Sequence, residues 1–145
     1  MAAGLDTFNL EIRRFPEGTR TAEEAARAIG CEVGQIVKSL VFTAGGAPVI
    51  ALVSGANRLD TAKLEAIAGA PVARADPETA RRATGYAIGG VPPFGHAQSL
   101  PVYMDRDLER YDVVWAAAGR PDAVFPITPA RLQELSAARV EDLAQ

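Results

Sequence analysis

The sequence predicts an α/β (α+β) fold in which helices flank one mixed β-sheet. Three observations support this class. Short apolar segments of strand length are interspersed with segments that carry helix-capping signals. One pair of strands is joined by a hairpin turn, whereas others are separated by helices that can serve as crossovers. The 145 residues contain no internal repeat and no linker-like segment, so we expect residues 1–145 to form one domain.

The N-terminal part predicts a strand followed by a helix. Phe8–Arg14 alternates between apolar and polar residues, which is typical of a half-buried strand. Thr21 and Glu24 have the spacing of a capping box, which predicts a helix over Ala22–Ile29. Gly30 then stands where a helix commonly ends with a glycine.

The next segment predicts a hairpin and a second helix. Ile36–Phe42 is apolar on both faces, as expected for a central strand. A turn at Ala44–Gly46 leads to a returning strand over Pro48–Val53. Asp60 has the position of an N-cap for a helix over Thr61–Ala68.

The remaining elements are short and alternate in type. We expect strands over Val72–Arg74, Leu100–Met104, Asp112–Ala117 and Ala123–Ile127. Helical segments are expected over Pro77–Ala83, over one turn from Asp105 to Arg110, and over Ala130–Ala138. The tail, Val140–Gln145, is expected to fray or to add a last turn.

The segment Thr84–Gly95, here called the Gly-Pro loop, has an unusual composition. It reads Thr-Gly-Tyr-Ala-Ile-Gly-Gly-Val-Pro-Pro-Phe-Gly, so large apolar residues alternate with glycines and prolines. A flexible linker lacks such apolar residues, and we therefore expect an ordered loop. Its main-chain N–H groups could point at a ligand, or the loop could be a rigid connection between two elements.

Composition excludes several classes of function. The formal net charge of −3 argues against broad, sequence-independent binding to nucleic acid, and we expect no DNA partner. The longest apolar stretches, Ala47–Val53 and Val113–Ala118, are too short for a bilayer, so we expect no membrane partner. Met1–Asp6 shows no secretory signal, and the single Cys31 fits a reducing cytosol. Together these features predict a cytoplasmic protein.

Lys38 is an unusual residue for its position. It lies inside the apolar strand Ile36–Phe42, and burying an unpaired ammonium costs several kcal/mol as an order of magnitude. Two interpretations follow. Lys38 could be a paired or partly exposed structural lysine, or it could line a pocket and bind an anion or a polar substrate. Lys63 is expected to be solvated on its helix.

The sequence lacks the usual catalytic and cofactor motifs. No Gly-x-Gly-x-x-Gly, phosphate-binding loop or Gly-x-Ser-x-Gly motif is present. One histidine and one cysteine cannot build a structural zinc site, so we expect no metal and no cofactor. His96, beside the Gly-Pro loop, is either a substrate contact or a surface residue. An enzyme with this inventory would use positioning, backbone donors and one cation, which suits hydrolysis of an activated ester.

Two motifs carry a resemblance to a known family. Gln35-Ile-Val-Lys38-Ser39-Leu-Val-Phe, the Gly-Pro loop and then Leu100-Pro101 resemble the YbaK/ProX family of aminoacyl-tRNA deacylases. These proteins are related to the editing domain inserted in bacterial prolyl-tRNA synthetases. The resemblance runs from about Thr21 to about Leu135. It implies a single domain with a mixed, curved β-sheet flanked by helices.

The resemblance also implies a function and a site. The protein would be a trans-editing deacylase that hydrolyses the ester of mischarged tRNA, with tRNA(Pro) carrying a small amino acid as the expected substrate. Its partners would be the aminoacyl-tRNA 3′ end and prolyl-tRNA synthetase. The expected catalytic residues are Lys38 and Gly89, and the tRNA's own terminal hydroxyl would assist. The expected substrate-binding residues are Ser39, Gly90, Pro92 and Pro93, to which we add the neighbouring His96.

One departure from the family pattern bears on specificity. Cysteine-specific members carry an aspartate at about the position of Val124, which is apolar. Alanine, serine, threonine and other small amino acids therefore stay as candidates. A non-catalytic module that binds a tRNA end, a nucleotide or a synthetase is the alternative function, and a regulatory homologue with another small ligand is a third.

Overall fold

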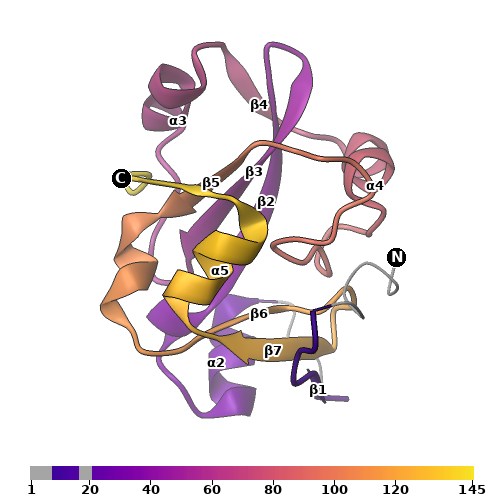
Figure 1. Ribbon diagram of the computed structural model, residues 1–145, viewed down its shortest axis with the longest axis vertical. Coiled ribbons are helices and arrows are strands. Elements are labelled where there is room, and N and C mark those ends of the chain that lie inside the picture. The colour runs from indigo at the N-terminus through magenta and orange to yellow at the C-terminus, as the bar shows by residue number, and fades with distance from the viewer. Residues whose placement is uncertain (1–7, 17–20) are drawn as a thin grey trace.

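The strands of the protein form two sheets. The computed structural model describes residues 8–16 and 21–145. One sheet has the strand order β1-β7-β6 and the other has the order β4-β2-β3-β5-β8. In the view of Figure 1, β6 and β7 lie below the long β2–β3 hairpin. A parallel bridge between Ile36 and Trp115 joins the two sheets.

The observed elements have the following bounds. The strands are β1 (Arg13–Arg14), β2 (Val37–Ala44), β3 (Ala47–Ser54), β4 (Val72–Arg74), β5 (Val102–Asp105), β6 (Val114–Ala117), β7 (Ala123–Ile127) and β8 (Arg139–Glu141). The helices are α2 (Ala22–Ile29), α3 (Thr61–Ala68), α4 (Pro77–Thr84) and α5 (Pro129–Ser136), with 3₁₀ turns at Val33–Gln35 and Arg106–Arg110. The predicted α/β class is thereby confirmed, with the strands divided between two sheets where we expected one.

The predicted hairpin and helix signals are confirmed. β2 and β3 pair antiparallel from Val37↔Ser54 to Ala44↔Ala47, and β3 pairs parallel with β5, so the larger sheet is mixed. Both residues of the hairpin turn are glycines in the left-handed region, with φ of 59° at Gly45 and 87° at Gly46. The capping box of α2 forms as predicted.

The two ends of the chain differ from their predictions. Of the expected strand Phe8–Arg14, only Arg13–Arg14 pairs with β7, because Asn9 adopts a left-handed conformation with φ of 56° and interrupts the extended chain. At the other end, the helix expected over Ala130–Ala138 already ends at Ser136, and the predicted fraying or last turn of Val140–Gln145 is wrong. β8 pairs with β5, and Leu143 is fully buried. The segment Met1–Asp6 lies outside the described residues.

Apolar side chains cover both faces of the larger sheet. Val37 and Val41 of β2 belong to a core that also contains the Gly-Pro loop and the three-stranded sheet. Phe42, on the other face of β2, packs in a second core with α3 and the C-terminal tail. This alternation places the side chains of Lys38 and Ser39 on opposite faces of β2.

The C-terminal tail also changes the interpretation of Lys63. Its ammonium donates to Asp142 Oδ2 at 2.9 Å and to the carbonyl of Ala144 at 2.7 Å. The lysine that we expected to be solvated therefore holds the tail beside α3. Among the described residues, no helix is long and apolar enough to cross a bilayer.

Candidate functional site

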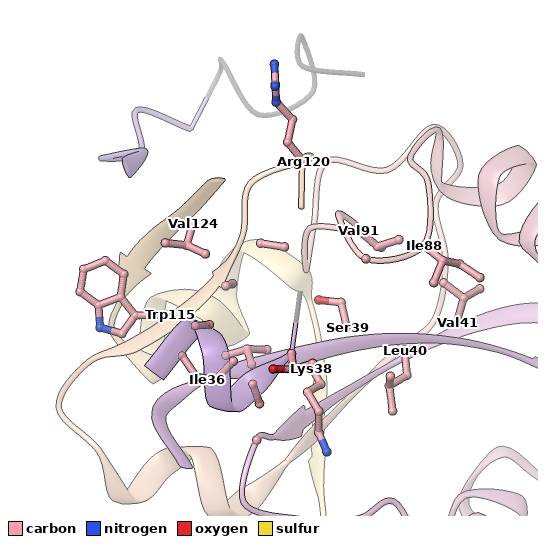
Figure 2. A pocket seen from close by; sticks show the side chains of 18 of the residues that line it. Ile36, Lys38, Ser39, Leu40, Val41, Ile88, Val91, Trp115, Arg120 and Val124 are labelled. Atoms are coloured by element: carbon pink, nitrogen blue, oxygen red, sulfur yellow. The ribbon is translucent and has the colours of Figure 1, made fainter. Parts of the chain in front are cut away.

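A cavity of about 390 Å³ lies between β2 and the Gly-Pro loop (Figure 2). The start of α2 and parts of β6 and β7 complete its walls. Its lining is mainly apolar and includes Ala22, Ala25, Ile36, Val41, Ile88, Val91, Trp115, Ala116 and Val124. Three of the predicted site residues, Lys38, Ser39 and Gly89, line this one cavity.

The cavity follows an unpaired edge of β2. On the side away from β3, β2 pairs with β4 only over Phe42–Ala44, and the bridge to Trp115 involves Ile36. Within the described part of the chain, Val37–Val41 thus has no strand partner on that side. All five residues of this gap line the cavity. A short stretch of strand edge is therefore open to a ligand.

The main-chain groups of Ser39 face this open edge. In an extended strand, the N–H and C=O of one residue point to the same side and alternate from residue to residue. Ile36 O accepts from Gly55 N at the β3 side, whereas Val41 O accepts from Ala75 N at the opposite side. Ser39 lies two residues before Val41, so its N–H and C=O point to the same side as those of Val41, which is the side of the cavity.

The hydroxyl of Ser39 adds a third polar group. Its Oγ is buried and has no hydrogen-bond partner among the described residues. A buried hydroxyl without a partner costs roughly 1–3 kcal/mol, so such groups are rare in native proteins. Figure 2 shows the hydroxyl on the side of β2 that faces Ile88 and Val91. Ser39 can therefore offer three hydrogen-bonding groups to one small ligand.

Lys38 leaves β2 in the opposite direction. Its ammonium donates to the main-chain carbonyl of Asn57 at 2.6 Å, and Figure 2 shows it extending away from Ser39 and the Gly-Pro loop. An ammonium has three N–H donors, so two are left for a ligand. Lys38 thus belongs to the same cavity as Gly89, but its charge is held on the other face of the sheet.

The surroundings of Lys38 shift its pKa. Partial burial lowers the pKa of Lys38 below its ordinary value, because desolvation disfavours the charged form. The carboxylates of Glu23 and Asp105 act in the opposite direction, and Arg58 adds to the lowering. A lysine in such a setting binds an anionic or polar group more readily than a fully hydrated surface lysine does.

The Gly-Pro loop is ordered, as the sequence predicted. Val91 and Phe94 are each 3% exposed and pack in the main core. The base of the loop is closed by a hydrogen bond of 2.8 Å from Ala97 N to Thr84 O. The Thr84 side chain is fully buried and also accepts from Tyr86 N. The loop is thus a fixed wall of the cavity.

Within this loop, Gly89 and Gly90 have different environments. Gly89 is exposed, has φ of 98°, and a Cβ there would meet nothing within 4 Å. Gly90 is buried, and a Cβ there would lie 3.0 Å from backbone atoms of Gly119 and Arg120. Gly90 N donates to Ala87 O, whereas Gly89 N has no acceptor in the described part of the chain. Gly89 is therefore the glycine that can offer its N–H to a ligand.

The other predicted substrate-binding residues do not line the cavity. Gly90, Pro92 and Pro93 are buried within the Gly-Pro loop. His96 Nε2 lies 2.6 Å from Pro92 O, so the imidazole forms a hydrogen bond with the main chain of the Gly-Pro loop. Burial lowers the pKa of His96, an effect that the Pro92 carbonyl partly offsets. Direct contact of these four residues with a substrate stays a prediction.

Several residues of the cavity were not predicted. Trp115 was expected only in the core, yet it lines the cavity while it is 9% exposed. Gly55 lines the cavity beside Lys38, and a Cβ there would lie 2.4 Å from Val33 O. Only glycine fits at this position, but the sequence shows no more than a glycine that follows an apolar strand. Arg74 and Arg120 also line the cavity, and Figure 2 shows the Arg120 side chain pointing away from it.

These features define a class of protein. No group of three or more potential metal ligands occurs among the described residues. The cavity supplies main-chain donors and one hydroxyl within apolar walls, and the Lys38 ammonium lies on the other face of β2. A cavity with a few hydrogen-bonding groups among apolar walls is typical of small-ligand sites. The fold and the cavity thus define a mixed α/β domain with a small-ligand site at a strand edge.

The comparison with protein families is consistent with that class. The family model named aminoacyl-tRNA editing domain matches residues 16–135. Because this match covers most of the chain, the protein belongs to the aminoacyl-tRNA editing domain family, as the resemblance in the sequence indicated.

Individual relatives and solved structures agree. EbsC of Enterococcus faecalis, named as a candidate Cys-tRNA(Pro)/Cys-tRNA(Cys) deacylase, is 30% identical over 84% of this chain and 80% of its own length. Proline–tRNA ligase of Elusimicrobium minutum is 32% identical over 90% of this chain, which corresponds to 23% of the ligase. A crystal structure described as a candidate trans-editing enzyme for prolyl-tRNA synthetase is 50% identical. It has a TM-score of 0.93 and covers 99% of this chain and 93% of its own.

Proposed function

We propose that this protein is a trans-editing deacylase that hydrolyses the ester of tRNA(Pro) mischarged with a small amino acid. The observation that carries the proposal is the open edge at Ser39, where an unpartnered hydroxyl and main-chain groups face a cavity that Lys38 and Gly89 also line. These groups match the polar atoms of an aminoacyl ester, which has a carbonyl oxygen and an α-amino group.

The chemistry requires little from side chains. Water attacks the carbonyl carbon of the ester, the acyl–oxygen bond breaks, and the terminal ribose oxygen of the tRNA leaves with a proton. Main-chain N–H groups of Ser39 and Gly89 can stabilise the oxyanion that forms during attack. The neighbouring hydroxyl of the tRNA terminus can guide the water. Lys38, whose ammonium lies on the other face of β2, has two donors that Asn57 leaves free for the adenosine end of the tRNA.

The walls of the cavity support a small amino acid. A volume of about 390 Å³ lies at the lower end for ligand pockets, and it must also hold part of the ribose. Val124 lines the cavity, at about the position where the resemblance to the YbaK/ProX family places the aspartate of cysteine-specific members. An apolar wall there favours alanine over more polar side chains, because a polar group would lose its hydration without a partner.

The test is a panel of tRNA(Pro) species charged with alanine, serine, threonine, cysteine or proline. For at least one small mischarged amino acid, we expect the protein to hydrolyse the ester to tRNA(Pro) at a rate above that of the spontaneous reaction. Pro-tRNA(Pro) should be left intact. Ser39→Ala should slow that hydrolysis because it removes the unpartnered hydroxyl. The absence of faster hydrolysis across the whole panel would contradict the deacylase function.

One observation favours a second candidate, a non-catalytic module that binds a tRNA end, a nucleotide or a synthetase. The Lys38 ammonium is bound to Asn57 O and extends away from the Gly-Pro loop, so it does not face Gly89 across the cavity. The same panel separates the two functions. A binding module would lengthen the lifetime of the ester, whereas a deacylase shortens it.

The proposed partners follow from the proposed substrate. With a net charge of −3, the protein has a weak electrostatic attraction for tRNA, so we expect prolyl-tRNA synthetase to present the mischarged tRNA to it. Adding the synthetase should increase the rate at low tRNA concentration. The proposal places the protein in the cytoplasm, where aminoacyl-tRNA is made and used.

A further inference from the structure

The loop that follows β3 holds the Lys38 ammonium. Asn57 supplies its main-chain carbonyl to Lys38, and this carbonyl is the group that the ammonium contacts at 2.6 Å. Gly55 N donates to Ile36 O at 2.7 Å, which fastens the start of the loop to the chain before β2. Ser54 Oγ donates to Gly34 O at 2.7 Å on the same side. The loop is therefore tied to its neighbours at several points.

A buried carboxylate fixes the other side of this loop. Asp105, the last residue of β5, is fully buried. Its Oδ2 accepts from Ser54 N at 3.1 Å and from Asn57 Nδ2 at 2.9 Å, and its Oδ1 accepts from Asp107 N at 3.0 Å. Asn57 Nδ2 also donates to Asp107 Oδ2 at 2.8 Å. Both amide protons of the Asn57 side chain thus point to carboxylates.

We propose that Asp105 and Asn57 are positioning residues that hold the Asn57 carbonyl in place, and through it the Lys38 ammonium, on the face of β2 opposite to Ser39. This inference rests on the proposed function for the role of Lys38. Lys38 has a long, flexible stem, and apolar packing alone does not fix the direction of its charged end. A directed hydrogen bond to a rigid carbonyl does fix it.

The charges around Lys38 agree with this arrangement. The groups that act on it are Glu23 on α2, Asp105 on β5 and Arg58 in the following loop. Asp105 has no cation within ion-pair distance among the described residues. Its charge is therefore available to stabilise Lys38 across the loop. Replacing Asp105 by asparagine should accordingly lower the pKa of Lys38 further.

The first experiment measures this effect without any substrate. The chain contains only two lysines, Lys38 and Lys63, so labelling lysine Cε with ¹³C gives two assignable NMR signals. Titration of the wild type, Asp105→Asn and Asn57→Ala should show a lower pKa or a shifted Lys38 signal in both variants. Lys63, which is bound to Asp142, should be unchanged and serves as the internal control. An unchanged Lys38 signal in both folded variants would overturn the proposal.

The second experiment measures single-turnover hydrolysis of the mischarged tRNA that the wild type cleaves best. Asp105→Asn and Asn57→Ala should each slow the reaction by about 10- to 100-fold, the range for a displaced catalytic group. In a Lys38→Ala background the same changes should have no further effect, because they act through Lys38. If Asp105→Asn or Asn57→Ala slowed hydrolysis by the same factor in the Lys38→Ala background as in the wild type, these residues would act independently of Lys38. That result would contradict the proposal.

A control variant separates positioning from general destabilisation. Ser136 is buried in α5 and donates to Leu132 O at 2.6 Å, so Ser136→Ala removes a buried hydrogen bond between two residues that do not line the cavity. It should lower stability without changing the Lys38 signal or the hydrolysis rate. If Asp105→Asn does not fold, Asn57→Ala, at a partly exposed position, carries both tests. A wild type without deacylase activity would refute the proposed function, while the NMR titration would still decide whether Asp105 and Asn57 hold Lys38.

Discussion

The two sides of the cavity are held in place by different forces. Lys38 is fixed by polar contacts, which run from its ammonium to Asn57 and from Asn57 to the buried Asp105. The Gly-Pro loop is fixed mainly by apolar anchors, of which Val91 and Phe94 are nearly fully buried. The difference reflects what each side offers a ligand. A flexible cation needs directed hydrogen bonds, whereas a loop that offers main-chain groups needs only a fixed position.

The largest effect is expected from removing the charge on the polar side. Lys38→Ala should slow deacylation by at least about 100-fold, the order of magnitude for losing one electrostatic contact in an active site. Thermal unfolding should change little, because the apolar contacts of both cores are kept. Lys63→Ala, which removes the ion pair to Asp142, is the matched control and should leave hydrolysis unchanged. Full activity of Lys38→Ala would exclude Lys38 from catalysis.

The next largest effect concerns the apolar side. Phe94 packs against Phe8 and Phe125, with ring centroids 4.7 Å and 5.7 Å away. Phe94→Ala should therefore lower the free energy of unfolding by about 3–5 kcal/mol, as measured by urea denaturation. Ile88→Ala, at a loop position that is 48% exposed, should change it by less than about 0.5 kcal/mol. Equal effects would mean that the loop is not anchored by Phe94.

A pair of glycine variants tests the position of the loop. Gly90→Ala should force the loop away from Gly119 and Arg120 and lower stability by about 1–3 kcal/mol. Gly89→Ala meets no atoms, and its positive φ costs about 1–2 kcal/mol. Amide NMR signals of Gly119 and Arg120 should move in Gly90→Ala and stay in Gly89→Ala. The opposite pattern would contradict the close contact at Gly90.

The smallest effect is a pH dependence on the apolar side. Burial lowers the pKa of His96 below its ordinary value of 6.5. As the pH falls below 6.5, the unfolded chain takes up a proton that the folded protein accepts only at lower pH, so stability decreases. Urea unfolding between about pH 7 and pH 5 should show this decrease, and His96→Gln should reduce it. A stability that rises as the pH falls over this range would contradict the lowered pKa of His96.

The comparison also shows where sequence-based prediction succeeded in the fold. The capping box of α2 and the Gly45-Gly46 turn were predicted correctly because each depends on residues within four positions of one another. The prediction of a strand over Phe8–Arg14 was wrong at Asn9, because the left-handed conformation of this residue interrupts the extended chain. The prediction for the C-terminal tail was wrong because β8 forms only by pairing with β5, which is distant in sequence.

In the site, too, prediction succeeded for features set by neighbouring residues and failed for contacts between distant segments. Lys38 was identified because a charge inside an apolar strand is unusual in any sequence, and the Gly-Pro loop because of its composition. Nothing local indicated that Asn57 and Asp105 would meet beside Lys38, since 48 residues separate them. Trp115 gave no signal beyond that of a core residue. Its place on the cavity wall depends on the bridge to Ile36.

The amino-acid sequence by itself thus determined the N-terminal caps of the helices, the hairpin and the two candidate segments, because caps, turns and alternation act between near neighbours. Only the tertiary structure decided that β2 has an open edge and that Lys38 and Ser39 lie on opposite faces of it beside one cavity. The physical reason is that an edge is defined by the strands that do not pair with it. Strand pairing between distant segments depends on how the whole chain packs.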